Sequence, residues 1–378
     1  MAGIYIHIPF CKQACHYCDF HFSTNVTKQR QLINAIGQEL LAQQNYLGEE
    51  EISTIYFGGG TPSLLSSGEV IQVLNVLKDN YDVNPSTEIT LEANPDDLTA
   101  EKLSDLKSVG INRLSIGIQS FDDTVLRFLN RAHNSDLAMR SFEYARKLGF
   151  DNISVDLMYA IPGQDLKAWE KNIDHLIALA PEHISTYSLT IEEKTVFGKW
   201  AAEKIINPRD NDDSATDLLL LIDKLEGAGY HHYEVSNFSK PGYISKHNSG
   251  YWKDEKYLGV GPSAHSYNGT ERQYNVSNNH LYINSIEAGQ IPATIEILTR
   301  EDKINECLLT GLRTSWGTNL QTLLKNHQYD LLRIHSRYIQ RLIDSNYALI
   351  SDESLVLTKK GRLLADKIAS DLFTMAYS

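Results

Sequence analysis

Near its N-terminus the chain reads IYIHIPFCKQACHYCDF from residue 4 to residue 20, and this stretch decides the fold. It opens with the Ile-rich pattern of a strand and breaks at Pro9. Three of the chain's four cysteines, Cys11, Cys15 and Cys18, follow on the next loop. Four cysteines are too few for a disulfide framework, so this cluster predicts metal or redox chemistry.

Strand-like runs alternate with helical patterns along the first half of the chain. Six such repeats predict parallel strands joined by right-handed crossovers. Six units are too few for a closed eight-stranded barrel, so we expect an α/β fold with an open, partial (β/α)6 TIM-like barrel. In such folds the chemistry gathers where the strands end. The predicted strands are Ile4–Ile8, Ile52–Phe57, Glu88–Leu91, Arg113–Ile118, Ile153–Leu157 and Ile184–Leu189.

The second half of the chain has a different pattern. A helix is expected at Ala215–Glu226, followed by a stretch rich in Tyr, His, Asn and Ser. From Ile295 onward the pattern is helical, with a hairpin in which four residues, 351–354, separate the strands, and a final helix at Lys359–Phe373. We therefore expect a barrel at 1–192, a barrel extension at 193–294 and a mostly helical, winged-helix-like appendage at 295–378.

Composition excludes several classes of function. The 378 residues carry a net charge of −13, and residues 301–378 hold 10 Lys+Arg against 9 Asp+Glu, so the winged-helix-like part has no basic footprint for nucleic acid. No apolar run approaches the ~18–20 residues of a membrane span. The N-terminus lacks the basic and apolar regions of a signal peptide. We expect a cytoplasmic protein that is not integral to a membrane.

The cysteine spacing, C-x3-C-x2-C, leaves two chemistries open. Three thiolates can hold three irons of a cubane and leave the fourth iron open to a ligand. Alternatively, the cysteines form a zinc site completed by His7, His16 or His21. The fourth cysteine, Cys307, lies in an apolar helical stretch, and we expect it to be buried there.

The cysteine motif, with Tyr17 just before its last cysteine, resembles the radical S-adenosylmethionine (SAM) superfamily. The resemblance implies a [4Fe-4S] cluster held by Cys11, Cys15 and Cys18, whose open iron binds the amino and carboxylate groups of SAM. The second predicted strand runs into GGGTP at residues 58–62, which looks like the superfamily's motif for the methionine amino group. Glycines suit that role, because backbone must approach the ligand closely.

Four further segments resemble one subgroup, the oxygen-independent coproporphyrinogen dehydrogenases and their relatives. They read EANP from residue 92, SIGIQSF from 115, LNRAH from 129 and DLMYAIPGQ from 156. The resemblance implies that Arg131 pairs with the SAM carboxylate, which suits a guanidinium fork. The implied SAM-binding residues are Tyr5, Tyr17, Gly59, Gly60, Thr61, Glu92, Gln119, Arg131 and Asp156.

Three features resemble the haem chaperone branch of this subgroup. Only four residues precede Tyr5, whereas the dehydrogenases carry a longer segment that helps close their active site. Phe20 stands where they have a further cysteine. Residues 246–252, KHNSGYW, match the H-N-x-x-Y-W pattern that the branch associates with haem. The implied haem-binding residues are His247, Asn248, Tyr251 and Trp252.

Haem binding at this motif is chemically plausible, because imidazole ligates haem iron and aromatic rings offer flat apolar surface to a porphyrin. Read without the resemblance, His247 and Asn248 are equally consistent with hydrogen-bonded core residues, and Trp252 with packing at the barrel edge. His265, in GPSAHS at 261–266, is a second possible ligand.

The resemblance thus implies a haem chaperone that binds haem and a SAM-ligated [4Fe-4S] cluster and delivers haem to acceptor proteins such as respiratory cytochromes. The alternative is oxygen-independent coproporphyrinogen III dehydrogenase, which converts propionate side chains to vinyl groups through a radical formed from SAM. We expect dehydrogenase activity to be absent, and we assign no catalytic side chain. Whether the chain catalyses another reaction is left open.

Overall fold

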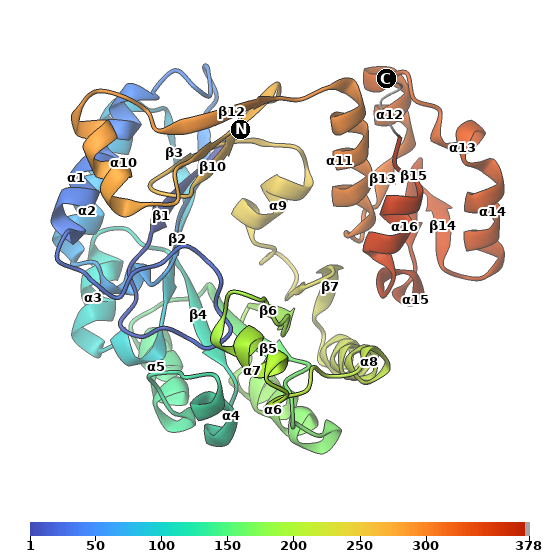
Figure 1. Cartoon of the computed structure of the whole chain (residues 1–378), viewed down its shortest axis with the longest axis horizontal. Coiled ribbons are helices and arrows are strands. Elements are labelled where there is room, and N and C mark those ends of the chain that lie inside the picture. The colour runs from blue at the N-terminus through green and yellow to red at the C-terminus, as the bar shows by residue number, and fades with distance from the viewer. Residues whose placement is uncertain (375–378) are drawn as a thin grey trace.

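The computed structural model describes residues 1–374, and Figure 1 shows the arrangement of its elements. Six parallel strands follow one another in chain order and pair with their sequence neighbours. Each of the six predicted strands is present, and most are one or more residues longer than expected. They are β1 (Ala2–Ile8), β2 (Ile52–Gly59), β3 (Val83–Ala93), β4 (Arg113–Gln119), β5 (Ile153–Tyr159) and β6 (His183–Ser188).

Helices connect these strands and bury their apolar faces against the sheet. Leu32, Ile33, Ile36 and Leu40 of the first helix are buried, whereas Leu41 is exposed. Side-chain caps fix several helix starts, as in the capping box that begins α2. The connecting helices are α1 (Gln29–Ala42), η1 (Pro62–Leu64), α2 (Ser67–Asn80), η2 (Pro95–Asp97), α3 (Ala100–Ser108), α4 (Asp123–Phe128), α5 (Ser135–Lys147) and α6 (Leu166–Leu179).

The central sheet extends beyond the six strands on both sides. On one side a strand pairs parallel to β1 and continues into an antiparallel meander; on the other a hairpin pairs antiparallel to β6. The twelve-stranded order is β12-β11-β10-β9-β1-β2-β3-β4-β5-β6-β8-β7, so β12 and β7 are edges and the barrel is open, as predicted. The added strands are β7 (His231–Glu234), β8 (Asn237–Ser239), β9 (Lys256–Val260), β10 (His265–Tyr267), β11 (Glu271–Asn275) and β12 (Ala293–Ile297).

Four helices accompany these added strands. The predicted helix at Ala215–Glu226 lies within a longer one, α8. The helix that carries the H-N-x-x-Y-W motif, α9, contacts β1 and β2 on one side and the first C-terminal helix, α11, on the other (Figure 1). The helices are α7 (Val196–Ala202), α8 (Asn211–Gly227), α9 (Lys246–Trp252) and α10 (Asn279–Glu287).

The C-terminal part has its own small sheet and its own hydrophobic cluster, from Ile304 to Leu372. Figure 1 shows its elements gathered beside the barrel. The three boundaries that we expected remain predictions, and the large sheet draws strands from both 1–192 and 193–294. The elements are α11 (Arg300–Leu312), β13 (Thr318–Asn319), α12 (Leu320–His327), α13 (Leu331–Ile334), α14 (Ser336–Asp344), β14 (Ala348–Ser351), β15 (Ser354–Leu357), α15 (Lys359–Arg362) and α16 (Ala365–Asp371).

Two local predictions in this part were wrong in detail. The hairpin β14–β15 turns through two residues, Asp352 and Glu353, rather than four, and both adopt positive φ. The final helix is not continuous to Phe373 but breaks between α15 and α16. Leu363, between the two helices, packs on the barrel's core, whereas Ile368 of α16 packs on the C-terminal core.

Candidate functional site

A cavity of about 470 Å³ opens where the parallel strands end. Its lining includes every residue that the sequence assigned to the cluster and to SAM, although these residues come from six separate segments of the chain. They are Tyr5, Cys11, Cys15, Tyr17, Cys18, Gly59, Gly60, Thr61, Glu92, Gln119, Arg131 and Asp156. A volume of this size lies in the range of about 300–1,000 Å³ that is typical of ligand pockets.

The cysteine loop is held in place by backbone hydrogen bonds. Cys11 N donates to Ser23 O at 3.0 Å, and Cys18 N donates to Cys15 O at 3.3 Å. All three cysteines are half-buried. Burial raises the pKa of Cys11 above its usual value and that of Cys18 to about 11. These thiols are therefore protonated at neutral pH until a metal displaces the protons.

The histidines that would complete a zinc site have other partners. His7 uses both ring nitrogens, one with the Tyr5 hydroxyl and one with the His21 carbonyl. His16 Nδ1 bonds Phe128 O, and His21 Nε2 bonds Asn279 Oδ1. In residues 1–374 no three His, Cys, Asp or Glu side chains converge as ligands of one ion would. The three cysteines of a [4Fe-4S] cubane need not converge on one atom, because each binds a different iron. The cysteines therefore fit a cluster better than a zinc ion.

The glycine motif lies against the cysteine loop with no room for a side chain. A Cβ atom on Gly60 would lie 2.7 Å from Phe10 O and 3.0 Å from Cys11 Sγ. A Cβ on Gly59, whose φ is 109°, would lie 2.7 Å from His7 Cε1. Both positions therefore require glycine, and this keeps the cavity wall close to the cysteines.

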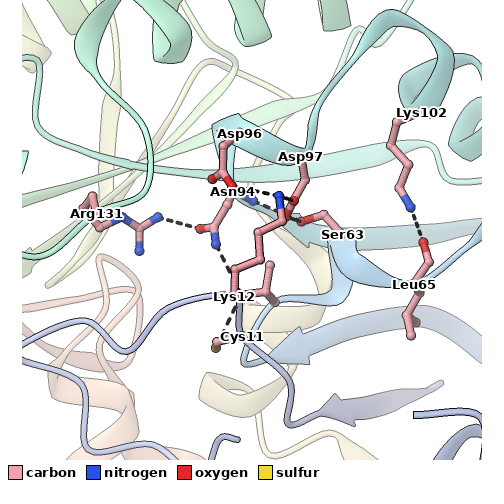
Figure 2. A network of polar contacts seen from close by, with 10 residues as sticks. Cys11, Lys12, Ser63, Leu65, Asn94, Asp96, Asp97, Lys102 and Arg131 are labelled. Carbon is pink, nitrogen blue, oxygen red and sulfur yellow. Dashed lines mark hydrogen bonds and ion pairs between the residues drawn. The ribbon is translucent and has the colours of Figure 1, made fainter. Parts of the chain in front are cut away.

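Arg131 lies between α4 and α5, in the connection from β4 to β5. It lines the cavity on the side of the cysteines. Its Nη1 lies 3.3 Å from Cys15 Sγ, its Nη2 donates to Gly117 O at 2.8 Å, and Figure 2 shows it pointing toward Asn94. Its Nε is buried without a hydrogen-bond partner among the described residues. The guanidinium can therefore donate further hydrogen bonds to an anionic group in the cavity.

Two half-buried carboxyl groups line the same cavity. Glu92 accepts from the Tyr56 hydroxyl at 2.8 Å and from Gly59 N at 3.2 Å, and Asp156 accepts from Ser115 Oγ at 3.1 Å. Burial raises the pKa of Glu92 to about 7 and that of Asp156 to about 6. A cationic ligand would favour the ionised form of both groups.

Gln119 enters the cavity because the backbone of β4 is irregular at its end. Its φ is 66°, rare for a residue with a side chain, and the β4–β5 register shifts between Gly117 and Gln119. Such irregularities redirect side chains and concentrate at functional sites.

Several site residues escaped the sequence reasoning. Lys12 forms ion pairs with Asp96 and Asp97, which ties the cysteine loop to η2 (Figure 2). Met158 and Leu189 add an apolar wall to the cavity. Their place in the sequence could have indicated Met158 and Leu189, since they lie at or just beyond the ends of β5 and β6. The Lys12 contact had no signal, because its partners are more than eighty residues away.

The H-N-x-x-Y-W motif lies elsewhere, near the beginnings of β1 and β2. His247 Nδ1 bonds Thr54 Oγ1 and its Nε2 bonds the Tyr251 hydroxyl, both at 2.8 Å. The imidazole is 4% exposed, its ring stacks on Tyr56 with centroids 5.0 Å apart, and burial lowers its pKa to about 3. We call Thr54, His247 and Tyr251 the barrel floor.

The barrel floor leaves no space for a porphyrin in this conformation. The void beside His247 measures about 10 Å³, and both of its ring nitrogens are engaged. Asn248 is half-buried, and Trp252 lies under Arg313 with its Nε1 buried and unpaired among the described residues. Haem ligation by His247 therefore stays a prediction, one that requires α9 to move. Cys307 lies in α11, half-buried rather than buried, and takes no part in the cavity.

Comparison with known proteins agrees with the fold and the cavity. The Radical SAM superfamily model matches residues 5–176, and the HemN C-terminal domain model matches residues 298–364. A solved structure of coproporphyrinogen III oxidase (HemN) from Escherichia coli superimposes with a TM-score of 0.85, at 23% identity, over 99% of this chain and 90% of that one. These matches define the class: a radical SAM fold with a HemN-type C-terminal part.

Relatives that are similar over nearly the whole sequence identify the family within this class. The chain is 37% identical to "Heme chaperone HemW" of Bacillus subtilis, covering 97% of this chain and 98% of that protein. It is 32% identical to the protein of the same name from Lactococcus lactis, covering 96% and 95%. The chain belongs to the HemW family of radical SAM proteins. Membership of the superfamily implies SAM and a [4Fe-4S] cluster. In residues 1–374 no helix is both long and apolar enough to cross a membrane.

Proposed function

We propose that this protein is a haem chaperone, which binds haem and passes it to acceptor haem proteins, respiratory cytochromes among them. The observation that carries the proposal is the similarity to curated haem chaperones along almost the entire length of both chains. All the residues assigned to the cluster and to SAM line one cavity, which supports the radical SAM part of the assignment. A cytoplasmic location stays a prediction.

We assign the cluster to Cys11, Cys15 and Cys18. Their three thiolates would hold three irons of a [4Fe-4S] cubane and leave the fourth to SAM, and the cluster would supply one-electron reducing chemistry there. The chain supports such a cluster in two ways: the Thr61 hydroxyl donates to Cys11 Sγ at 3.4 Å, and Arg131 lies beside Cys15 Sγ. Both contacts stabilise the thiolate form that ligation requires.

We assign SAM to the rest of the cavity. The unpaired donors of Arg131 suit its carboxylate, and the close backbone at Gly59, Gly60 and Thr61 suits its amino group. The carboxyl groups of Glu92 and Asp156, with the amide of Gln119, suit its polar and cationic groups. Tyr5 and Tyr17 form aromatic wall. With SAM assigned to this cavity, we place haem outside it.

The experiment that tests the proposal compares the two candidate functions on one sample. The anaerobically reconstituted protein is titrated with haem and, in parallel, incubated with coproporphyrinogen III, reductant and SAM. We expect a stoichiometric haem complex and no protoporphyrinogen IX. Dehydrogenase turnover without haem binding would assign the alternative function, which the HemN-like fold alone does not establish.

A further inference from the structure

Because the barrel floor is closed, another side chain is needed to ligate the haem iron, and the histidines differ in how far their ring nitrogens are already bonded. In four of the 13 histidines neither ring nitrogen forms a hydrogen bond within residues 1–374. They are His175, His231, His265 and His327. In these four, either ring nitrogen can ligate a haem iron without losing a hydrogen bond, whereas His16, His21 and His133 each already use one nitrogen and keep only the other.

The four lie in different surroundings. His175 lies on α6 with its ring edge against Phe121, and His327 ends α12 in the C-terminal part. His231 begins β7, an edge strand, beside an open cavity of about 580 Å³. His265 begins β10, four residues after Gly261, where an added Cβ would lie 2.6 Å from the carbonyl oxygen of the cavity residue His7. Of the four, His265 is the one next to the SAM cavity.

Flat aromatic surface accompanies His265. Its ring stacks on Tyr274 with centroids 5.5 Å apart and an interplanar angle of 29°, and Tyr274 is 41% exposed. Phe20, on the cysteine loop, is 69% exposed and lines the cavity mouth. The His21–Asn279 hydrogen bond ties that loop to α10, just after β11, which carries Tyr274. We call His265 and Tyr274 the rim patch.

The backbone before His265 is unusually constrained. Gly261 has φ of 102° and Ser263 has φ of 65°, a backbone region that residues with side chains rarely adopt. Ser263 N bonds Val276 O at 3.1 Å and Asn275 N bonds Ala264 O at 2.9 Å, so the turn is braced from β11. A strained, braced turn fixes the direction of the imidazole that follows it.

Charge and protonation also suit a haem. Burial, followed by the nearby Arg272 guanidinium, lowers the pKa of His265, which keeps its ring neutral at physiological pH. Arg272 pairs with Glu306 at 3.0 Å but keeps a buried Nε without a partner among the described residues. It can therefore offer a cation to a haem propionate at the same edge of the sheet.

We propose that His265 is the axial ligand of the haem iron, with the porphyrin lying on the rim patch at the mouth of the SAM cavity. The proposal rests on the proposed function, since it presumes that the protein binds haem. The step is simple ligation: an imidazole lone pair enters a vacant iron position, with no change in oxidation state.

The test is haem titration of the full-length reconstituted protein and its variants, followed by absorption and electron paramagnetic resonance spectra. His265→Ala should weaken haem affinity at least tenfold and remove the histidine-type spectrum, and added imidazole should restore that spectrum. Tyr274→Ala should weaken affinity by a smaller factor. His175→Ala is the matched control, an exposed imidazole with no hydrogen bond, and should behave as wild type.

The outcomes separate this proposal from the proposed function. If the wild type binds no haem, the proposed function fails. If the wild type binds haem and His265→Ala keeps its spectrum and affinity, only the assignment of His265 fails. Loss of the spectrum in His231→Ala or His247→Gln, but not in His265→Ala, would overturn it in favour of that histidine. The cluster absorption of each variant reports whether the barrel has folded.

Discussion

The parallel strands carry one polar region at their carboxyl ends and another near their beginnings, and only the first is open to a ligand. At their carboxyl ends, the cavity residues keep unused capacity: Arg131 has an unpaired Nε, and Glu92 and Asp156 have pKa values raised by burial. Near their beginnings, the barrel floor is closed, because His247 spends both nitrogens on Thr54 and Tyr251. Both regions carry conspicuous sequence motifs. A polar side chain is open to a ligand where it keeps a free donor, as Arg131 does, and closed where its donors and acceptors bond to one another, as at His247.

The largest expected effect concerns the cysteines of the open region. Cys11→Ala, Cys15→Ala or Cys18→Ala should each abolish the [4Fe-4S] cluster, because two thiolates cannot hold three of its irons. Cys307→Ala, the matched control in α11, should keep it. Iron and sulfide per chain after anaerobic reconstitution measure the result. An equal loss in Cys307→Ala would show that the loss comes from misfolding and not from ligation.

The next effect concerns the closed region. His247→Ala removes two buried hydrogen bonds and leaves the Thr54 and Tyr251 hydroxyls unpaired, so it should lower the free energy of unfolding by roughly 2–5 kcal/mol. His175→Ala, on the exposed face of α6, should change it by less than about 0.5 kcal/mol. Urea unfolding measures both. A His247→Ala protein as stable as wild type would contradict a structural role for the barrel floor and strengthen its assignment to haem.

A smaller effect returns to the cavity. Arg131→Ala should weaken SAM binding by ~1.5–3 kcal/mol, roughly ten- to a hundredfold, because a charge-assisted hydrogen bond to the carboxylate is lost. Arg127→Ala removes an exposed guanidinium whose partner is Thr124 on the same helix, and it should bind SAM normally. Equilibrium SAM binding to the reconstituted protein gives both affinities. Equal affinity in the two variants would remove Arg131 from the site.

The smallest effect is a pH dependence. The pKa of Glu92 is raised to about 7, so its carboxylate is populated above that pH and is lost as pH falls. A ligand that needs the carboxylate should therefore bind more weakly below pH 7, by at most about tenfold per pH unit for one titrating group. Glu92→Gln should flatten this part of the SAM-binding profile. A wild-type affinity independent of pH between 5 and 8 would contradict the role of Glu92.

The sequence predicted the open region better than the rest, for a physical reason. Each strand of the partial barrel has a local apolar pattern, and parallel strands bring their ends to one edge. The family resemblance assigned residues as distant as Cys11 and Asp156 to one site, and the strand order explains how they meet there. The family resemblance supplied their roles, which the residue types alone left open between iron and zinc.

What escaped prediction depends on contacts between distant segments. Lys256–Val260 is a short segment of mixed polarity, and its pattern does not predict a strand that pairs parallel to β1. His247 is closed to ligands partly because its Nδ1 bonds Thr54, which is 193 residues away. The residues around the break before α16 pack on two different hydrophobic cores. Periodicity carries no information about partners at that separation.

The most direct test of the account is haem transfer. The haem-loaded, cluster-containing protein is mixed with the apo form of a b-type haem protein whose absorption spectrum differs from its own, and spectra are followed over time. The account predicts that haem leaves the chaperone and appears in the acceptor, faster than haem moves from a non-specific carrier such as serum albumin. A stable haem complex that never loads the acceptor, while the sample oxidises coproporphyrinogen III, would contradict it.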